Sequence, residues 1–443
     1  MKTRVDLFIK NGLVLAHAAL DARPKSSLAI KNGLILDIGP TESLSQQYEA
    51  PIEIDAQNCL VMPGLVNTHT HIPMSCYRGL ADDLPLMEWL HKSIFPAEAK
   101  TTRDQVYWSS LLSCAEMIRS GTTAFCDMYL FEEEVAKATD KAGLRALLGE
   151  GLFGFPSTSY GPIDQGIAWT KRLIEEYRNH PRIHFAVMPH APYTCPPQLL
   201  ELSARIAREN KVPLAIHLAE TEAEDQEIRS KHGMSPVELL DHLGFLGPDV
   251  IAAHCVWLSE HDKELLVKHK VKVAYNPESN MKLGSGVAPI ADLLARGIQV
   301  GLGTDGSASN NDQDLFAEMD MAAKLQKVHR KDPTQLTAHQ VLHMATLGGA
   351  EVLGLGSQIG TLEPGKFADI IILEMDKPHW HPLYSLPSQI VYSAKGPDVR
   401  DTIVQGKLLM QDRKILVFDE SEVFSHIQGI RAKVLEDTGR ILG

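Results

Sequence analysis

The central region of the chain alternates short apolar runs with longer segments of helical spacing. Apolar residues at intervals of three and four predict helices over 103–121 and 197–211, for example. The runs between the helical segments have the length and composition of buried strands. About eight of them follow one another, at 59–69, 122–129, 145–153, 183–191, 212–220, 250–258, 271–276 and 299–305. Buried strands that alternate with helices in this number predict an α/β fold, a (β/α)8 barrel of the TIM type. A doubly wound open sheet is the competing arrangement, but no G-x-G-x-x-G turn follows the first run.

The two ends of the chain have a different pattern. Short alternating segments bounded by Gly, Asn or Pro fill residues 1–62 and return at 367–375, 401–410 and 414–418, which is typical of antiparallel strands and turns. We therefore predict a small β-sandwich built from both ends, with the two termini close together. The predicted organisation is a first β-sandwich segment over 1–62, a catalytic barrel over 63–360, and a second β-sandwich segment plus a C-terminal helix over 361–443.

The composition and charge of the chain argue against several classes of protein. The 443 residues carry 43 Lys+Arg against 56 Asp+Glu, a formal net charge of −13, which argues against a general nucleic-acid binder. No apolar run reaches the length of about 18 residues that spans a membrane, and the N-terminus lacks a signal-peptide pattern. The six cysteines are scattered without a C-x-x-C pair and are expected to be reduced, which favours a cytoplasmic protein without a membrane partner.

Polar residues gather where the predicted strands end, which in a barrel is the active-site mouth. His69 and His71 lie in NTHTH at the end of the first run, and side chains two residues apart on a strand point to the same side. Two imidazoles placed in this way can reach one metal ion. Two histidines at this spacing also occur by chance, and such histidines are then exposed to solvent or form structural hydrogen bonds.

Further runs strengthen the metal interpretation. His217 lies in the fifth run, His254 in the sixth, and Asp305 ends the eighth. Taken singly, His254 could be a buried core histidine and Asp305 a helix cap or turn residue. Histidines and a carboxylate that converge from different strands suit Zn²⁺ with water in an open position, and they make metal binding the favoured interpretation.

Catalysis by such a site also needs a group that moves protons. Bound zinc lowers the pKa of water from about 15.7 to roughly 7, and Glu220, three residues past His217, is placed to exchange protons with a substrate. Alternatively, Glu220 is a solvated loop carboxylate among other acidic residues. Spacing alone leaves open whether His254 binds the metal or orients the water.

At this point the sequence resembles the amidohydrolase superfamily, and within it the deaminases of 5′-methylthioadenosine, S-adenosylhomocysteine and related adenosine nucleosides. The resemblance covers nearly the whole chain. It rests on the motifs PGLVNTHTHIPMSCYRGLADDLPLMEWL (63–90), MPHAPYTC (188–195), HLAET (217–221), AAHCVWL (252–258), NPESNMKLGSG (276–286), GLGTDGSASNNDQDLF (301–316) and GTLEPGKFADIIIL (360–373).

The resemblance implies roles for the strand-end residues. It implies one metal ion per subunit, expected to be Zn²⁺ although other divalent metals fit the same donors, held by His69, His71, His217 and Asp305. Glu220 would move protons among the water, the purine nitrogen and the departing amine. His254 would hydrogen-bond the attacking hydroxide, and Asp305 would also be the base for the water.

Three further residues match substrate contacts of the resembled deaminases. Trp89 and Glu98 match residues that contact the sugar, and His190 matches another nucleoside contact. Each also has a structural alternative: Trp89 as core packing, Glu98 as helix surface and His190 as a structural histidine at a strand end.

At two positions this sequence differs from related proteins, and these differences refine the predictions of substrate and metal content. Relatives often carry an Arg some two dozen residues before the histidine of strand four, whereas Gln165 stands there in this chain and the nearest basic residues are Lys171 and Arg172. We therefore expect methylthioadenosine or adenosine to be preferred over S-adenosylhomocysteine. His190 occupies the place of the carboxylated Lys of binuclear relatives, which predicts a mononuclear site.

The leading hypothesis is hydrolytic deamination of adenine nucleosides to inosine analogues, with release of ammonia. Guanine or 8-oxoguanine deamination and triazine dechlorination on the same fold are the alternatives, and a catalytically inactive scaffold is a third. The small-molecule nucleoside is the expected partner. Relatives are commonly dimers or tetramers, but no feature of this sequence demands a homo-oligomer.

Overall fold

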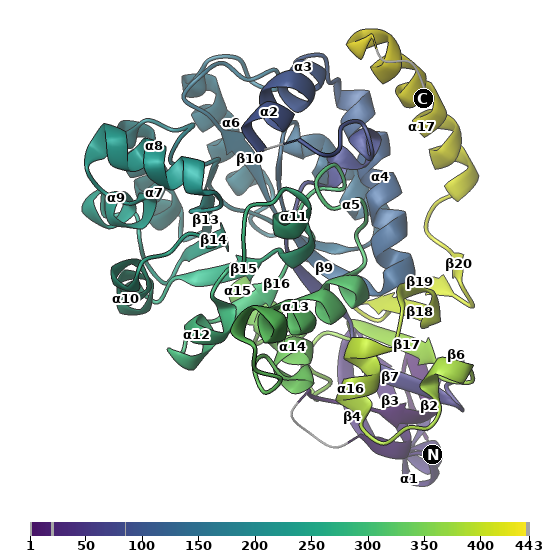
Figure 1. Ribbon diagram of the computed structural model, residues 1–443. Coiled ribbons are helices and arrows are strands. Elements are labelled where there is room, and N and C mark those ends of the chain that lie inside the picture. Colours follow the sequence, from purple (N-terminus) through teal and green to yellow (C-terminus); the bar gives the residue numbers. More distant parts are fainter. Residues whose placement is uncertain (1, 19–21, 85, 440–443) are drawn as a thin grey trace.

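The computed structural model describes residues 2–18, 22–84 and 86–439 (Figure 1). Its centre is built from parallel strands in two sheets. One sheet has the order β11-β10-β9-β8, with β12 also paired to β10, and the other has the order β13-β14-β15-β16. The strands are β8 (Leu65–Thr70), β9 (Thr122–Tyr129), β10 (Arg145–Leu152), β11 (Ile183–Phe185), β12 (Met188–Pro189), β13 (Leu214–Leu218), β14 (Val250–His254), β15 (Lys272–Tyr275) and β16 (Val300–Leu302). Each predicted apolar run contains at least one of them.

Isolated parallel bridges lie between the two parallel sheets. One joins Thr70 of β8 to Asp305, just beyond β16, and the other joins Val187 to Leu214 of β13. Backbone bonds continue the same connections, since Asp305 N donates to His69 O at 2.9 Å and Val187 N to Pro213 O at 3.0 Å. The ends of β8 and β16 therefore meet, which brings the first and last predicted runs together.

Helices follow the strands and cover the outside of the parallel sheets (Figure 1). Thr102 and Gly121 bound the first long one, because the Thr102 side chain accepts from Gln105 N and Gly121 takes the left-handed conformation that ends a helix. The helices are α4 (Arg103–Ser120), α5 (Glu132–Ala142), α6 (Ile163–Glu176), α7 (Pro197–Asn210), α8 (Glu222–His232), α9 (Pro236–His242), α10 (Glu260–His269), α11 (Pro277–Lys282), α12 (Ile290–Ala295), α13 (Leu315–Arg330), α14 (Ala338–Met344) and α15 (Leu347–Val352). Before α4, the chain forms η1 (Ile72–Tyr77), α2 (Leu86–Trp89), the π-helical segment η2 (Leu90–Ile94) and α3 (Phe95–Glu98).

Strands from both chain ends meet in a third, nine-stranded sheet of mostly antiparallel pairs. Its order is β20-β19-β18-β17-β7-β2-β3-β4, with β6 paired to β2, and the β7–β17 pair joins the two ends of the sequence. The strands are β2 (Leu7–Val14), β3 (Arg23–Lys31), β4 (Leu34–Pro40), β6 (Ile52–Asp55), β7 (Cys59–Pro63), β17 (Ile370–Glu374), β18 (Val399–Val404), β19 (Lys407–Gln411) and β20 (Lys414–Ile415). The short strands β1 (Thr3–Arg4) and β5 (Tyr48–Glu49) pair separately, and α1 (Thr41–Gln47) and α16 (Leu386–Tyr392) complete this region.

The two described ends of the chain do not lie together, contrary to the expectation from the sequence. Helix α17 (Glu420–Thr438) leaves the nine-stranded sheet and runs along α4 towards α3 (Figure 1). Arg119 forms two hydrogen bonds with Glu420 at its start, and Lys100 Nζ donates to Asp437 O at 2.7 Å near its end. The apolar side chains of Val423, Ile430 and Val434 are buried under it, which is why the helix stays against α4.

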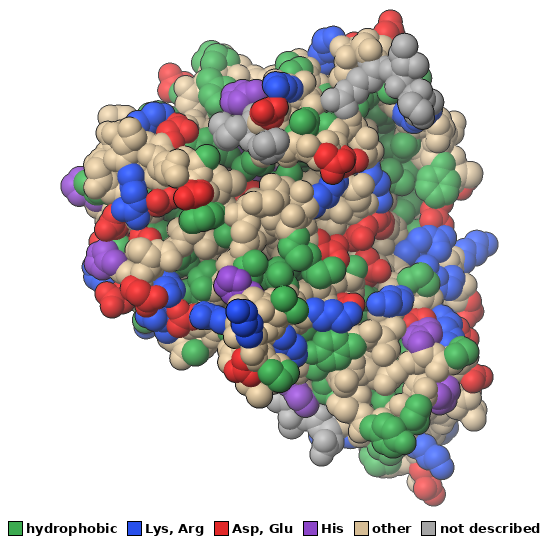
Figure 2. Space-filling model, viewed as in Figure 1, with side chains coloured by type: hydrophobic (Ala, Val, Ile, Leu, Met, Phe, Trp, Pro, Cys, Tyr) green, Lys and Arg blue, Asp and Glu red, His purple; other side chains and the backbone are tan. Residues whose placement is uncertain are grey.

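Charged side chains of both signs are interspersed over the face of the molecule in Figure 2. Among the described residues, no helix combines the length and apolar character needed to cross a membrane.

Candidate active site

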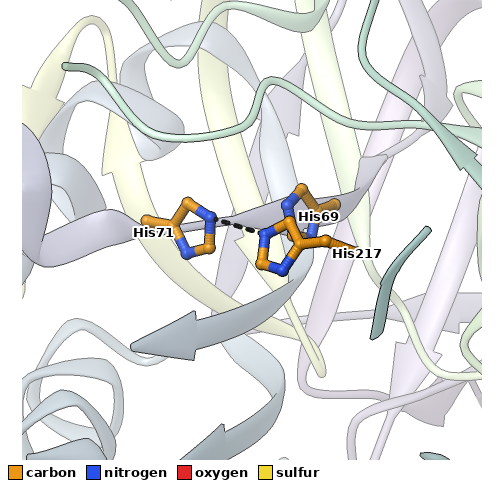
Figure 3. Close-up of side chains that lie close together, drawn as sticks. All are labelled: His69, His71 and His217. Atoms are coloured by element: carbon orange, nitrogen blue, oxygen red, sulfur yellow. Dashed lines mark hydrogen bonds between the residues drawn. The ribbon is translucent and has the colours of Figure 1, made fainter. Parts of the chain in front are cut away.

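The predicted metal-binding residues converge at the carboxyl ends of the parallel strands. His69 lies in β8 and His71 directly after it, His217 lies in β13, His254 ends β14, and Asp305 follows β16. Donor atoms of His69, His71 and His217 all lie within 4.8 Å of one another, as do those of His69, His254 and Asp305. Figure 3 shows His71 and His217 facing each other, with their Nε2 atoms 3.2 Å apart. Side chains from widely separated segments of the sequence therefore meet at one point in space.

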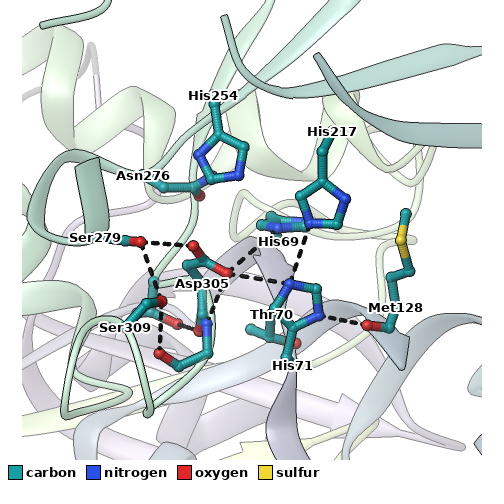
Figure 4. Close-up of polar contacts among 12 residues, drawn as sticks. His69, Thr70, His71, Met128, His217, His254, Asn276, Ser279, Asp305 and Ser309 are labelled. Carbon is teal, nitrogen blue, oxygen red and sulfur yellow. Dashed lines mark hydrogen bonds and ion pairs between the residues drawn. The ribbon is translucent and has the colours of Figure 1, made fainter. Parts of the chain in front are cut away.

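Asp305 faces the histidines with one oxygen and the protein with the other. Its Oδ1 lies 3.2 Å from His71 Nε2 and 3.6 Å from His69 Nε2, while its Oδ2 accepts a 2.6 Å hydrogen bond from Ser279 Oγ (Figure 4). The backbone turns sharply here, since Asp305 has φ +63° and His254 has φ +74°. Such left-handed conformations are costly for residues other than glycine and occur preferentially at functional sites.

The hydrogen bonds of the histidines leave nitrogens directed at a common point. Nδ1 of His71 bonds to Met128 O, and Nδ1 of His217 donates to His190 O at 2.8 Å. Each ring then presents the lone pair of Nε2 to the centre, where two lone pairs 3.2 Å apart repel unless a proton or cation lies between them. Nε2 of His69 is buried without a hydrogen-bond partner among the described residues. Because a ligating histidine typically donates its other N–H to a carbonyl or carboxylate, this donor set fits a cation such as Zn²⁺.

Burial and interactions among the donor side chains shift the pKa values of these donors and so determine which of them are charged. Burial lowers the pKa of His69, and burial together with the neighbouring histidines lowers that of His217 well below its usual range. For His71, burial also lowers the pKa, but the bond to Asp305 and the charges of Asp305 and Asp127 outweigh it and raise the pKa to about 9. Burial opposes ionisation of Asp305, yet the neighbouring His69 and His71 hold the pKa well below the usual range. The site thus keeps an ionised Asp305 beside the neutral rings of His69 and His217 and beside a protonated His71, whose Nε2 proton a bound metal ion would displace.

Glu220 and His254 form a second pair beside the histidines. Glu220 Oε2 lies 3.7 Å from His254 Nε2, and Ser285 Oγ lies 3.4 Å from Glu220 Oε1. Burial, with the charges of Asp305 and Glu224, raises the pKa of Glu220 well above its usual value. Asn280 Nδ2 lies 2.9 Å from His254 Nδ1 and donates to it, so the proton of the neutral ring is on Nε2, and burial lowers the His254 pKa to about 3. A protonated carboxyl and a neutral imidazole N–H therefore face the same space.

A cavity opens from this cluster and contains the remaining predicted residues. Trp89, Glu98 and His190 all line it. Trp89 is nearly buried and donates from Nε1 to Ala81 O at 3.1 Å, and His190 Nδ1 lies 2.9 Å from Thr194 Oγ1. Burial raises the pKa of Glu98 to about 7, while Tyr129 and His71 oppose that shift. The rest of the wall is largely apolar, with Leu86, Leu90, Ile94, Phe95, Leu130, Phe153 and Leu283, as is usual for small-molecule sites.

Comparison with known proteins gives the family. The model of the amidohydrolase family matches residues 60–409, most of the chain. The chain belongs to the amidohydrolase family. It is 52% identical over 429 residues to a 5-methylthioadenosine/S-adenosylhomocysteine deaminase of Syntrophobacter fumaroxidans, covering 97% of this chain and 98% of that protein. It is 48% identical over 427 residues to a 5′-deoxyadenosine deaminase of Methanosarcina mazei, covering 96% and 97%.

Solved structures agree with the family assignment. An adenosine deaminase from Xanthomonas campestris with bound zinc has a TM-score of 0.96 and 34% identity, with 98% of this amidohydrolase and 100% of that chain covered. A triazine hydrolase has a TM-score of 0.88 over 96% and 99% of the two chains, but at 22% identity it shows the fold alone.

Several residues of the amidohydrolase site were missed by sequence reasoning. Ser279 and Asn280 bond to Asp305 and His254, Thr194 to His190, and Glu224 accepts from the backbone N–H groups of Ala219 and Glu220. Ser279 and Asn280 lie in the motif NPESN, so the motif was a signal, but its residues had no assigned contact.

The position where relatives carry an Arg lies outside the cavity. Gln165 is exposed on α6, and Arg172 bonds to Glu133 on the surface. Among the described residues that line the cavity, none is Lys or Arg. The described part of the cavity wall therefore offers no lysine or arginine to an anionic group of a substrate.

Proposed function

We propose that this protein is a metal-dependent hydrolase that deaminates adenine nucleosides at C6, giving the inosine analogue and ammonia. The observation that carries the proposal is the convergence of His69, His71, His217 and Asp305 beside the buried pair Glu220 and His254. Full-length similarity to deaminases of 5-methylthioadenosine, S-adenosylhomocysteine and 5′-deoxyadenosine supports the substrate class.

The fold that supports this function is proposed to be a closed (β/α)8 barrel over 63–360, with a small β-sandwich from 1–62 and 361–443. The parallel bridges Thr70–Asp305 and Val187–Leu214 support closure. A separate apolar cluster with members from both chain ends, including Ile9, Leu28, Val61 and Ile370, supports the second domain.

The metal is proposed to be one Zn²⁺ ion, held by His69, His71, His217 and Asp305. When bound, Zn²⁺ lowers the pKa of water from about 15.7 to roughly 7 and so supplies a hydroxide nucleophile at neutral pH. The zinc-bound relative supports the choice of metal.

Asp305 and His254 are proposed to act on the oxygen of the nucleophile. Asp305 is ionised, with Oδ1 facing the histidines, and can accept the proton of the water. The Nε2–H of His254 can donate to the same oxygen, since Asn280 occupies Nδ1. Hydrogen bonds that are already directed at developing negative charge lower the barrier most effectively.

Glu220 is proposed to be the general acid and base for the purine. Its raised pKa keeps the carboxyl protonated until a ring nitrogen accepts the proton, which makes C6 electrophilic. The resulting carboxylate can take a proton again and pass it to the departing amine. A carboxyl group buried beside Asp305 suits both steps, because its proton affinity is already high.

Trp89, Glu98 and His190 are proposed to hold the nucleoside. Glu98 would accept hydrogen bonds from the ribose hydroxyls, Trp89 would cover the sugar, and His190 would hydrogen-bond the purine or sugar through Nε2. The uncharged remainder of the described cavity wall favours methylthioadenosine, 5′-deoxyadenosine or adenosine over S-adenosylhomocysteine, whose amino-acid end is charged.

The test is ultraviolet absorbance of the zinc-loaded protein with methylthioadenosine, 5′-deoxyadenosine, adenosine, S-adenosylhomocysteine and guanine, with ammonia release measured in parallel. We expect conversion of adenine nucleosides to inosine forms, and loss of that conversion in Glu220→Ala. Conversion of guanine alone would refute the proposal in favour of a free-base deaminase, and no conversion of any of these compounds by the zinc-loaded protein would also refute it.

A further inference from the structure

Asp127, a buried residue of β9, holds the backbone on both sides of the metal-site residue His71. Its Oδ1 accepts hydrogen bonds from Thr70 Oγ1 and from Ile72 N, each at 2.6 Å. Its side chain is fully buried. A single carboxylate oxygen therefore fixes the residue before His71 and the residue after it.

The contacts of Asp127 with Thr70 and Ile72 replace the backbone pairing between β8 and β9 at the end of their sheet. The β8–β9 register shifts between Asn67 and Thr70, and after Thr70 the chain leaves the sheet and enters η1. On the opposite side, Asp305 N donates to His69 O. The segment His69–His71 is thus held from the β16 side by backbone and from the β9 side by the Asp127 carboxylate.

Asp127 in turn faces a second buried carboxyl, that of Glu132 at the start of α5. The two side chains are within hydrogen-bond distance of each other, and both are fully buried. Asp127 Oδ2 and both oxygens of Glu132 have no N–H or O–H donor among the described residues. Two carboxyl oxygens in contact repel unless one of them carries a proton.

The environment decides which carboxyl is protonated. Asp127 already accepts two hydrogen bonds, which favours its ionised form, whereas Glu132 accepts none from the described residues. Burial, followed by the charge of Asp127, raises the pKa of Glu132 well above its usual value.

Glu150 of β10 keeps Glu132 in place. It accepts from the backbone N–H groups of Phe131 at 3.2 Å and of Glu132 at 3.0 Å. Phe131, directly before α5, has φ +56°, a left-handed conformation that is costly for residues other than glycine. A continuous chain of contacts therefore runs from Glu150 through Glu132 and Asp127 to the backbone around His71.

We propose that Glu132 is a buried carboxylic acid that donates a hydrogen bond to Asp127, and that this carboxyl pair positions His71 for metal binding. Asp127 and Glu132 are positioning residues, since neither lines the cavity. The inference rests on the proposed metal site where it is tested by zinc affinity. The protonated carboxyl of Glu132, in contrast, can be detected in the metal-free protein.

The experiment compares zinc affinity, measured by competition with a chromophoric chelator, in the full-length wild type and its variants. Glu132→Gln retains a donor to Asp127 and is expected to bind zinc like the wild type. Glu132→Leu leaves Asp127 unpaired and is expected to bind zinc about 10- to 100-fold more weakly, the usual range for lost outer contacts of a metal site. The matched control is Asp401→Asn, which removes a fully buried carboxylate paired with Arg400 in the nine-stranded sheet and should not change zinc affinity.

Infrared spectroscopy of the metal-free protein tests the proton directly. In the difference spectrum, the wild type should show one C=O stretch of a buried carboxylic acid that Glu132→Gln lacks, beside the band of the protonated Glu220 that both proteins share. In Asp127→Asn the Glu132 band should remain at a shifted frequency, because burial still raises the pKa of Glu132 while the partner of its carboxyl becomes an amide. That variant should keep its zinc affinity, because the oxygen of the new amide still accepts from Thr70 and Ile72.

Two results would overturn the inference. One is equal zinc affinity in Glu132→Leu and wild type, and the other is the lack of any acid band that depends on Glu132. Failure of the wild type to bind zinc refutes the proposed function, while the infrared band still tests the carboxyl pair.

Discussion

At the residue scale, the site uses the same carboxyl chemistry for different tasks. Asp305 is held ionised by His69 and His71, whereas burial keeps Glu220 protonated and raises the pKa of Glu98 to about 7. Charge partners and burial shift a pKa in opposite directions, so residues of one type can be a metal donor, an acid and a substrate contact.

Replacing Glu220 by Gln removes the proposed acid and retains its size. We expect kcat for an adenine nucleoside to fall about 10²- to 10⁴-fold, the contribution of a positioned proton donor, with zinc content unchanged. Steady-state kinetics and metal analysis check this. Glu222→Gln, an exposed acid two residues further on, is the control and should retain full activity. Similar kcat values for Glu220→Gln and wild type would contradict the role.

Glu98 gives a prediction about pH. Its carboxyl accepts ribose hydroxyls best when ionised, and its pKa is raised to about 7 by burial. The KM for adenosine should therefore fall as pH rises through about 7, and this dependence should be absent in Glu98→Gln. The same variant should weaken deamination of a nucleoside more than that of any free base the enzyme accepts. Equal losses for nucleoside and free base would count against ribose recognition.

The sequence predicted which side chains converge at the candidate site better than the residues that contact them. Pairs such as His69 and His71, and strand-end positions such as His217 and Asp305, follow from strand periodicity. Ser279, Asn280 and Asp127 are single polar residues whose roles depend on which side chain the fold brings opposite to them. No local pattern contains that information.

At the element scale, the first predicted run proved to be two strands. The apolar pattern predicts one strand over 59–69, but β7 belongs to the nine-stranded sheet and β8 to a parallel sheet, with Gly64 between them. A Cβ at Gly64 would lie 2.1 Å from Thr123 Oγ1. The apolar sequence continues through the junction because both strands are buried, and hydrophobicity alone therefore hides the change of sheet.

This junction makes Gly64 a sensitive glycine to test. Gly64→Ala should lower the free energy of unfolding by about 1–3 kcal/mol or prevent folding, as expected when a packed core receives an extra group. Gly429→Ala is the matched control, since it lies in α17 with nothing within 4 Å of its Cβ. That change should stabilise the protein by about 0.5–1 kcal/mol. Denaturant unfolding of both variants gives the comparison, and unchanged stability of Gly64→Ala would refute the steric argument.

At the scale of the whole molecule, the site connects segments that the sequence separates widely. The proposed metal donors come from β8 in one parallel sheet and from β13 and the end of β16 in the other. Helix α17 returns from the nine-stranded sheet to α3, beside the proposed substrate contact Glu98. The sequence predicted that this end contains a helix but not where it packs, because the amphipathic pattern of α17 specifies a buried face and not the surface that covers it.

A metal ion that joins both parallel sheets should stabilise the whole protein. A ligand that binds only the folded state adds about 4 kcal/mol at a concentration about a thousandfold above its Kd, so chelator-treated protein should unfold several degrees below the zinc-loaded form. One equivalent of Zn²⁺ should restore the higher Tm, because the donor set holds one ion. His217→Ala should abolish the zinc-dependent shift, whereas His261→Ala, an exposed histidine on α10, should preserve it. The shift should be larger at about pH 8 than at about pH 5.5, since protons compete with the metal for the imidazole nitrogens.

Differential scanning fluorimetry across these conditions measures the zinc-dependent shift in Tm. A Tm that does not depend on zinc would mean that the donors do not bind the ion tightly. A shift that saturates at two equivalents would instead contradict the proposal of a single ion per site.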